Sequence, residues 1–303
     1  MKNTLTVLLF ALVCSSISAQ EKGFYLRGGL GYNFPVAGQM YDNSGFPFNG
    51  SYTSSSAQGD VYDVKNASFS SGLHGQLGLG YMFNKYLGIQ LDMSIGLANT
   101  KYTGSENNIV IQDTMHGNVS ITQYASTPVL LMPSIVLQNG GSVFNVYARA
   151  GVAVPLNTKL TQEVAVSNLP GSGAIETDVY TYQLKNSFAI GFTGAMGLQY
   201  NTSERIGFWA EINMLSMSLN PRESDLKSIT VNGAPYPLSA ISPSQLTIQY
   251  SKSITVSPGT NNQQPTYSIP FSNVGIHLGM TIKFQHEDHS KGRYVTPRQF
   301  HRD

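Results

Sequence analysis

Residues 72–98 read GLHGQLGLGYMFNKYLGIQLDMSIGLA and alternate apolar side chains with small or polar ones along two arms. The apolar set runs from Leu73 to Phe83 in the first arm and from Leu87 to Leu97 in the second. A period of two on both sides of the polar turn Asn84-Lys85 predicts an antiparallel β-hairpin. Each arm has about the 9–11 residues that a tilted strand needs to cross a bilayer. One apolar face and one small, polar face are typical of a membrane hairpin with lipid outside and a polar lumen inside.

Residues 1–19 have the features of an export signal, with a positive start, an apolar centre from Leu5 to Val13 and a small residue, Ala19, at the end. The apolar centre is too short to span a bilayer as a helix. The chain's single cysteine, Cys14, lies inside this segment, so we expect no disulfide and no cysteine-based metal or redox site in the mature chain. Acylation of Cys14 is the alternative, although Ala11-Leu12-Val13 matches the usual lead-in poorly.

The composition fits an exported membrane protein. Charged residues make up 12% of the chain, about half the usual share of soluble domains. Without Lys2 the mature chain has 17 basic and 17 acidic residues, which gives no electrostatic footprint for nucleic acid. Mean hydropathy is −0.11, and no later apolar run reaches the roughly 20 residues of a membrane helix. In a membrane, only a closed β-barrel would satisfy the backbone of such a chain.

Six further segments alternate with the same period, which brings the expected number of spanning strands to eight. These segments are 23–34, 121–137, 143–156, 182–200, 206–219 and 274–284. Two prolines in 121–137 predict irregular pairing there, and the phase of 206–219 slips near Leu215, where we expect a bulge.

The connections between these segments fall into two classes that alternate along the chain. Short turns are expected at 84–85, 139–141 and 202–204, and long polar loops at about 35–70, 101–118, 157–180 and 220–272. Outer-membrane barrels combine short periplasmic turns with long extracellular loops in this way. The sequence therefore predicts an all-β fold: an eight-stranded antiparallel transmembrane up-and-down β-barrel with both termini in the periplasm.

The last long connection contains two strand-like elements. Residues 228–233, Ser-Ile-Thr-Val-Asn-Gly, predict a hairpin turn, and Leu246 to Val256 have strand character. These elements either prolong the barrel above the membrane or add two spanning strands, which would give ten.

The chain resembles a known family, the small outer-membrane β-barrels of Gram-negative bacteria of the OmpA/OmpX-like type. The resemblance covers about residues 20–285 and rests on FYLRGGLGYNF (24–34), LGLGYMFNKYLGIQLDM (77–93) and the final strand ending at Phe284. It implies an outer-membrane location among outer-membrane lipids and lipopolysaccharide. It also implies recognition by the barrel-assembly machinery, which would have to read Phe284 internally because residues 286–303 follow it. The resemblance includes no peptidoglycan-binding domain, since 18 residues cannot fold into one.

The inward phase of the predicted strands carries most of the residues that could serve a function. Charges in a narrow lumen must be paired or strongly hydrogen-bonded, so we expect an ion-pair network there. Its predicted members are Arg27, Asp92, Arg149, Lys185 and Glu211. Further polar lumen residues are predicted at His74, Gln76, Gln90, His277 and Lys283. An eight-stranded interior is just wide enough for its own side chains, which predicts a plugged lumen. A gated narrow pore is the alternative.

We expect no catalytic residue, cofactor or metal. No nucleophile signature is present, although Ser94 or Ser187 beside Asp92 and a histidine could imitate a hydrolase site. A lipid-modifying barrel enzyme would place its Ser/His pair on the lipid-facing surface, whereas His74 and His277 lie in the inward phase. The tail cluster at 286–289 is interpreted as a solvated end rather than as a metal site.

The sequence thus predicts three segments: a signal peptide at 1–19, an outer-membrane β-barrel at 20–285 and a polar periplasmic tail at 286–303. The predicted function is a non-enzymatic outer-membrane protein with a plugged polar lumen and long extracellular loops. Its role would be structural or in surface interaction and adhesion, with an extracellular ligand bound through the loops. A narrow porin or small-solute channel is the alternative.

Overall fold

The structure is a computed structural model that describes residues 22–36, 39–41, 53–54, 64–98, 100–111, 115–169, 176–254 and 262–285. The predicted signal peptide and the predicted tail lie outside these residues. Strands dominate the described chain, and helical structure is limited to two short turns, η1 (Leu238–Ala240) and α2 (Pro243–Leu246). Within the described ranges, no helix combines the length and the apolar character needed to cross a membrane.

Eight long strands form a closed barrel, as predicted. They are β1 (Gly23–Pro35), β5 (Gly72–Met82), β6 (Leu87–Gly96), β9 (Val129–Gln138), β10 (Phe144–Asn157), β13 (Gly191–Asn201), β14 (Ile206–Ser216) and β21 (Asn273–Gln285). Around the wall the order is β1-β21-β14-β13-β10-β9-β6-β5, and every neighbouring pair is antiparallel. This order follows the chain, so the topology is up-and-down. Because the sheet closes on itself, no barrel strand leaves an unpaired edge in the hydrocarbon.

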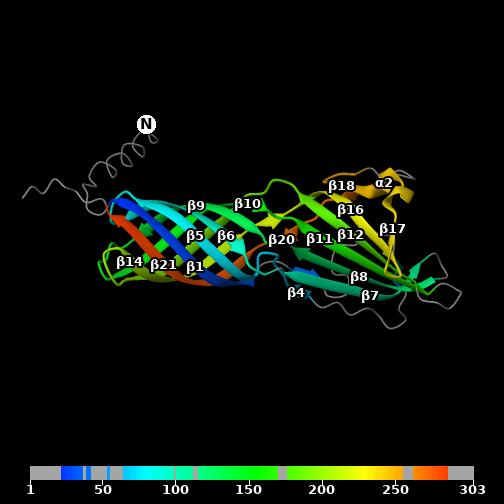
Figure 1. The fold of residues 1–303 in the computed structure, drawn as a ribbon, viewed down its shortest axis with the longest axis horizontal. Helices are drawn as coiled ribbons and strands as arrows, with labels where there is room; N and C mark the ends of the chain where they lie inside the picture. The colour runs from blue at the N-terminus through cyan, green and yellow to red at the C-terminus, as the bar shows by residue number, and fades with distance from the viewer. Residues whose placement is uncertain are drawn as a thin grey trace, which may run out of the picture.

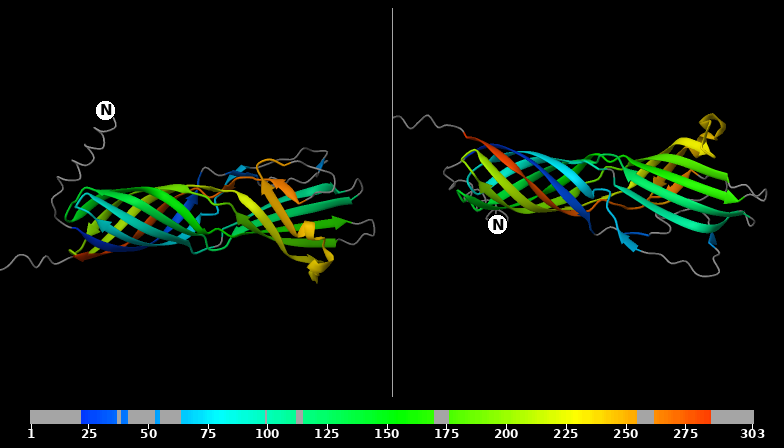
Figure 2. Two further views of the ribbon diagram at one scale, coloured as in Figure 1. Left: turned by 90° about the horizontal axis from the view of Figure 1, so that it is seen from above. Right: turned by 60° about the horizontal axis from the view of Figure 1, so that its bottom comes forward.

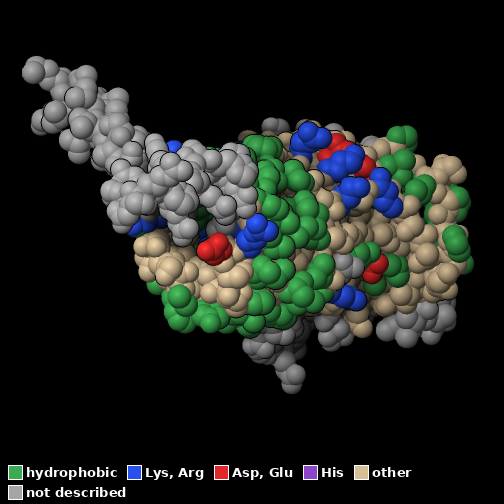
Figure 3. All heavy atoms as spheres, turned by 60° about the vertical axis from the view of Figure 1, so that its left-hand side comes forward, with side chains coloured by type: hydrophobic (Ala, Val, Ile, Leu, Met, Phe, Trp, Pro, Cys, Tyr) green, Lys and Arg blue, Asp and Glu red, His purple; other side chains and the backbone are tan. Residues whose placement is uncertain are grey.

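The period of two separates a lipid face from a lumen face. In β5 and β6 the outward leucines are about half exposed, while the inward partners are buried. Figure 3 shows a belt of apolar side chains across the face of the molecule that it views. Aromatic pairs lie near both ends of the belt, for example Phe24 with Tyr81 and Tyr32 with Phe34, as interfacial girdles require.

A second sheet stands on one end of the barrel (Figure 1). It contains β3 (Thr53–Ser54), β7 (Lys101–Ile111), β8 (Met115–Ala125), β11 (Leu160–Leu169), β12 (Glu176–Asn186), β16 (Pro221–Val231), β17 (Ala234–Tyr236), β18 (Thr247–Ser251) and β19 (Gln263–Pro265). Two small ladders pair β2 (Gln39–Tyr41) with β4 (Val64–Asn66) and β15 (Ser218–Leu219) with β20 (Ile269–Pro270). The views in Figure 2 show the outer sheet continuing the long axis of the barrel.

The loop prediction is wrong for much of the connections 101–118 and 157–180, whereas the strand-like elements predicted in 220–272 are confirmed and prolong the fold above the membrane. All three connections contain strands of the outer sheet. Residues 161–167 and 177–183 are half-buried at every position, so both faces of these strands are partly solvated and need no apolar period. The Asn232-Gly233 turn between β16 and β17 is confirmed, and both of its residues have positive φ. The ten-strand alternative is wrong, since the extra strands prolong the fold above the membrane.

Two predicted strands are in fact each divided between the two sheets. Segment 121–137 breaks at Ser126-Thr127-Pro128, where Thr127 has φ 38°, so β8 ends in the outer sheet before β9 begins in the barrel. Segment 182–200 breaks at residues 187–190 between β12 and β13. The predicted phase slip near Leu215 is also wrong, because that side chain points inward in step with the rest of β14 and the ladders beside it show no shift.

An apolar junction cluster joins the two sheets. It includes Leu130, Met132, Ala153 and Leu215 from the barrel, Val119, Ile121, Ala125, Leu160 and Leu184 from the outer sheet, and Ala67, Phe69, Met217, Leu219, Ile269 and Phe271 from the connecting segments. Phe69 and Phe271 are fully buried, and the Phe69 amide donates to the Pro270 carbonyl at 3.0 Å. The outer sheet is thus packed onto the barrel through a core of its own.

A charge on the belt should impair membrane folding far more than the same charge on the outer sheet. Leu91→Arg places a guanidinium in the middle of β6 on the lipid face, and we expect a loss of roughly 2–4 kcal/mol in folding free energy. Urea unfolding in liposomes, followed by the heat-modifiable mobility of the folded barrel, measures this. The matched control is Ser228→Arg, an exposed position of β16. Equal loss in both variants would contradict the assignment of the lipid face.

Candidate functional site in the barrel lumen

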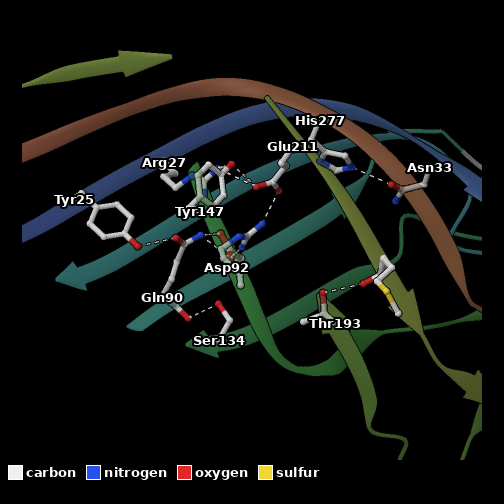
Figure 4. Close-up of polar contacts among 12 residues, drawn as sticks. Tyr25, Arg27, Asn33, Gln90, Asp92, Ser134, Tyr147, Thr193, Glu211 and His277 are labelled. Atoms are coloured by element: carbon white, nitrogen blue, oxygen red, sulfur yellow. Dashed lines mark hydrogen bonds and ion pairs between the residues drawn. The ribbon is translucent and has the colours of Figure 1, made fainter. Parts of the chain in front are cut away.

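Four charged side chains meet in the middle of the lumen, and Figure 4 labels three of them, Arg27, Asp92 and Glu211. Arg27, Asp92, Arg149 and Glu211, from β1, β6, β10 and β14, are all buried. Two cations and two anions make the group neutral. Buried charges are retained only when they are paired and hydrogen-bonded, and this group meets both conditions.

Glu211 is the centre of this lumen network. Its Oε2 accepts from Arg27 Nη2 at 3.0 Å and from the Tyr147 hydroxyl at 2.7 Å, and its Oε1 pairs with Arg149 Nη2 at 2.5 Å. Arg149 Nη1 pairs with Asp92, so one guanidinium bridges both carboxylates. Each acid is bound by at least one arginine, and Glu211 is bound by two.

Polar aromatic and amide groups complete the contacts. The Tyr25 hydroxyl donates to Gln90 Oε1 at 2.7 Å, and Gln90 Nε2 donates to the Asp92 carboxylate at 2.6 and 2.7 Å. The Arg27 guanidinium lies 4.1 Å from the ring centroid of Trp209 and 4.8 Å from that of Tyr147. Cation–π contacts of this kind are strongest where the cation is desolvated.

The network crosses the barrel in two directions. In the ring of eight strands, β1 lies opposite β10 and β14 lies opposite β6. Arg27 on β1 donates to Tyr147 on β10 at 2.7 Å, while Arg149 on β10 links the acids of β6 and β14. Four alternate strands therefore supply the charges, and their side chains meet across the axis of the barrel.

Glycines on the strands between make room for these side chains. A Cβ at Gly78 would overlap the Asp92 carboxylate, and one at Gly197 would lie 2.5 Å from the Tyr147 ring. A Cβ at Gly279 would overlap the Trp209 ring. The inward glycines of β5, β13 and β21 thus pair with large inward residues on neighbouring strands, which fills a narrow interior without clashes.

A histidine layer lies next to the network, toward the outer sheet. His277 Nε2 donates to Asn33 Oδ1 at 2.9 Å, and His74 Nδ1 lies 3.2 Å from Ser94 Oγ. Both histidines flank Gly31 of β1 in register. Above them Asn273 Nδ2 donates to the Ser70 carbonyl at 3.0 Å, directly below the apolar junction cluster. Polar contacts therefore continue from the centre of the lumen to its outer mouth.

The structure places most of the predicted lumen residues inside the barrel. Gln76, Gln90, His74 and His277 are buried there, and Lys283 is half-buried on the inward face of β21. The prediction for Lys185 is wrong. This residue lies in β12 of the outer sheet and is exposed to solvent. Residues 187–190 separate β12 from the barrel strand β13, so the inward and outward positions of β13 do not predict those of β12.

Lys185 belongs instead to a surface charge cluster with Glu223, Asp225 and Lys227. Its Nζ lies 2.7 Å from Glu223 Oε1 and 2.9 Å from Asp225 Oδ2, and Lys227 Nζ donates to the same Asp225 oxygen at 3.0 Å. These two lysines hold the pKa of the Asp225 carboxyl at about 2. The bonds to Glu223 and Asp225 in turn raise the pKa of Lys185.

Tyr25, Tyr147 and Trp209 are network members that the sequence did not single out. Their inward phase was readable from the alternation. An additional signal that could have identified them is an inward glycine on an adjacent strand, because a large aromatic side chain fits into a narrow barrel only beside a residue without a side chain.

The described residues assemble no metal site and no hydrolase arrangement. Within them, no three His, Cys, Asp or Glu side chains come together to hold a metal. His74 and Ser94 are close, but the Asp92 carboxylate is bound by Gln90 and Arg149, and His74 Nε2 has no hydrogen-bond partner among the described residues. The predicted tail cluster at 286–289 lies outside the described residues.

A closed, antiparallel, eight-stranded barrel with an apolar outer belt and a charged interior defines a transmembrane barrel of the outer-membrane type. Residues 5–233 match the model of the outer membrane protein beta-barrel domain family. The chain belongs to this family, and its location is the outer membrane. No curated protein sequence matches the chain.

Several solved structures of outer-membrane proteins are similar to the chain. OprG from Pseudomonas aeruginosa has 13% identity and a TM-score of 0.41, with 89% of this chain and 100% of OprG covered. Ail of Yersinia pestis and CarO2 of Acinetobacter baumannii each have 11% identity and a TM-score of 0.28, with 88% of this chain and 100% of theirs covered. The identities and TM-scores of these structures carry no argument by themselves. The assignment of the chain to its family rests on the match of residues 5–233 to the family model.

Removing the central acid of the lumen network should destabilise the barrel. Glu211→Ala leaves both arginines short of an anion in a buried site, and we expect a loss of about 3–5 kcal/mol in the free energy of unfolding. Urea unfolding in detergent measures this. Glu223→Ala removes an acid from a solvent-exposed pair and should cost about 0–1 kcal/mol. Similar losses in the two variants would mean that the lumen charges are as well solvated as surface charges.

The surface charge cluster should keep Asp225 ionised in acid. A carboxyl with a lowered pKa contributes stability that is complete above the ordinary aspartate value of about 3.9 and is lost as the pH falls through about 2. Lys185→Gln should therefore move the titration midpoint of Asp225 up toward the ordinary value, as measured by NMR of the carboxyl carbon. Lys252→Gln changes an exposed lysine that directly follows β18 and is the control. A midpoint that is unchanged by Lys185→Gln would contradict the pairing.

Proposed function

We propose that this protein is a non-enzymatic, closed outer-membrane barrel that holds a rigid β-sheet above the membrane for structural or surface-interaction roles. The single observation that carries the closed lumen is the network from Arg27 to Glu211, which joins opposite walls of the barrel through direct contacts of 2.5–3.0 Å. A chain of direct contacts across the axis leaves no continuous path for a hydrated solute at that level.

A second level of closure supports the proposal. Phe69 and Phe271, both fully buried, lie with the barrel residues Leu130 and Leu215 in the apolar junction cluster at the outer mouth. An ion passing this level would exchange much of its hydration for contacts with apolar side chains, which is costly. The lumen is therefore blocked once by paired charges and once by packed apolar groups.

The outer sheet supports a role in surface interaction. Strands of up to 11 residues extend the barrel hairpins away from the membrane, and their ladders pair across β7, β8, β11, β12 and β16. Preformed strands lose less conformational entropy on binding than disordered loops do, which favours the recognition of large partners such as matrix or host molecules. The extracellular ligand, lipopolysaccharide around the barrel and the barrel-assembly machinery are the partners this proposal includes.

A narrow channel is the second candidate, and one observation favours it. Several buried polar atoms of the lumen have no protein partner among the described residues, including Arg27 Nε, Arg149 Nε, Trp209 Nε1 and His277 Nδ1. Buried polar atoms are normally satisfied by ordered water, so the lumen has the chemistry to hold some. The closed barrel is preferred because isolated water sites do not form a path through the ion pairs and the apolar junction cluster.

Conductance in planar bilayers tests the closed lumen. The purified full chain should show no single-channel conductance. The combined variant Asp92→Ser/Arg149→Ser/Phe271→Ala removes side chains from both levels of closure and should conduct, provided that its heat-modifiable mobility shows a folded barrel. The control Lys185→Ser/Asp225→Ser removes one charge of each sign from the outer sheet and should remain silent.

Steady, charge-selective openings of the unmodified protein would overturn the closed lumen in favour of the channel. Surface interaction is tested separately, by adhesion of cells that display the protein to immobilised glycans and matrix proteins. Adhesion equal to that of cells lacking the protein would exclude the surface-interaction role, and only the structural role would remain.

A further inference from the structure

Two lysines lie side by side on the outer wall just above the apolar belt. Leu160 of β11 pairs with Leu184 of β12, and one step lower Asn186 Nδ2 donates to the Thr158 carbonyl at 2.7 Å. Lys159 and Lys185 lie between these two contacts and are therefore neighbours. Since Leu160 and Leu184 are buried inward, the alternation turns both lysines outward, and both are exposed.

The upper edge of the lipid-facing surface lies directly below this pair. Leu156, three residues before Lys159, is 60% exposed. Phe188, three residues after Lys185, is 79% exposed, the highest value among the large apolar side chains of the described chain. At about 3.3 Å per residue, the lysines lie within about 10 Å of the last lipid-facing groups. That height corresponds to the headgroup layer of the outer leaflet.

The charges around the lysine pair sum to a positive value. Lys159 has no side-chain partner among the described residues, while Lys185 and Lys227 share the carboxylates of Glu223 and Asp225. The patch of Lys159, Lys185 and Lys227 with Glu223 and Asp225 therefore carries a net charge of +1. The next acid along β11, Glu163, is four residues further from the membrane and accepts from the Tyr124 hydroxyl at 3.3 Å. Figure 3 shows basic side chains gathered beside the apolar belt, with acidic ones among them.

We propose that Lys159 and Lys185, above Leu156 and Phe188, form a binding site for the phosphorylated headgroup of an outer-leaflet lipid. The ammonium groups contact phosphate while the lipid's acyl chains lie along the exposed leucine and phenylalanine. Glu223 and Asp225 hold the Lys185 ammonium in place and at the same time limit the net charge of the site. The site rests on the outer-membrane location and does not depend on whether the lumen conducts.

A lipid is preferred over a free phosphate because the basic pair and the apolar edge are continuous. Each lysine near an anionic surface contributes about fivefold in affinity, which is too little to hold a small anion in water. Acyl chains against the belt supply the remaining affinity. The occupant is therefore an amphiphile with a phosphate group.

Native mass spectrometry of the full chain released from detergent micelles tests the site with diphosphoryl lipid A as the probe. The unmodified protein should carry lipid adducts, and Lys159→Gln/Lys185→Gln should lower the affinity about 25-fold. Glu223→Gln should raise the affinity, because it removes a competing anion and leaves both lysines. Lys85→Gln/Arg205→Gln removes two exposed cations from the turns at the opposite end of the barrel and should leave the affinity unchanged.

Two further probes separate the sources of binding. The same lipid without its phosphates should bind the unmodified protein and the Lys159→Gln/Lys185→Gln variant equally weakly, and inorganic phosphate should not bind. Equal affinity of diphosphoryl lipid A for the unmodified protein and this variant, with both shown to be folded by heat-modifiable mobility, would overturn the site. Binding of inorganic phosphate with an affinity similar to that of the lipid would overturn the assignment to a lipid.

Discussion

Hydrocarbon offers no hydrogen bond to a peptide group, and this constraint governs the rest of the structure. A spanning strand can satisfy its backbone only by pairing on both sides, so the eight strands must close. Once the sheet is closed, each strand has one face toward lipid and one toward a narrow interior. The alternation from Leu73 to Leu97, with leucines outward and glycine, glutamine or aspartate inward, is the direct consequence.

The polar groups of the interior then have to form their hydrogen bonds and ion pairs with one another. A charge that faces a narrow lumen has little water to solvate it. The buried charges of Arg27, Asp92, Arg149 and Glu211 are therefore each stabilised by an ion pair with an opposite charge. The same lack of space explains the inward glycines. Tyr147 and Trp209 fit because Gly197 and Gly279 lie beside them on adjacent strands. Large side chains and glycines therefore alternate from strand to strand at these positions. The lumen network and the inward glycines are two aspects of one packing solution.

Above the membrane, water can form hydrogen bonds with the backbone, so the outer sheet does not have to close as the barrel does. The hairpins continue into the outer sheet, where one face meets water and the other packs over the apolar junction cluster around Phe69 and Phe271. There charges such as Lys185 and Asp225 pair at the surface, with ordinary solvation. The chain passes between the two regimes at short breaks such as 126–128 and 187–190, and Lys159 and Lys185 lie at or just above such breaks, close to the headgroups.

The sequence by itself determined the barrel, the number of its strands, the facing of nearly every spanning residue and the membership of Arg27, Asp92, Arg149 and Glu211 in the lumen. It could do so because lipid on one side and a narrow lumen on the other impose a strict period of two. Only the tertiary structure decided where Lys185 lies, that residues 101–118 and 157–180 contain strands, that these join the strands of 220–272 in a second sheet, and that Leu215 stays in phase. In water a strand needs no apolar period, so residues 101–111 and 221–231 resemble loops in composition. The breaks at Thr127 and at residues 187–190 depend on which sheet each half of the segment pairs with, and pairing partners far apart in the chain leave no local signal.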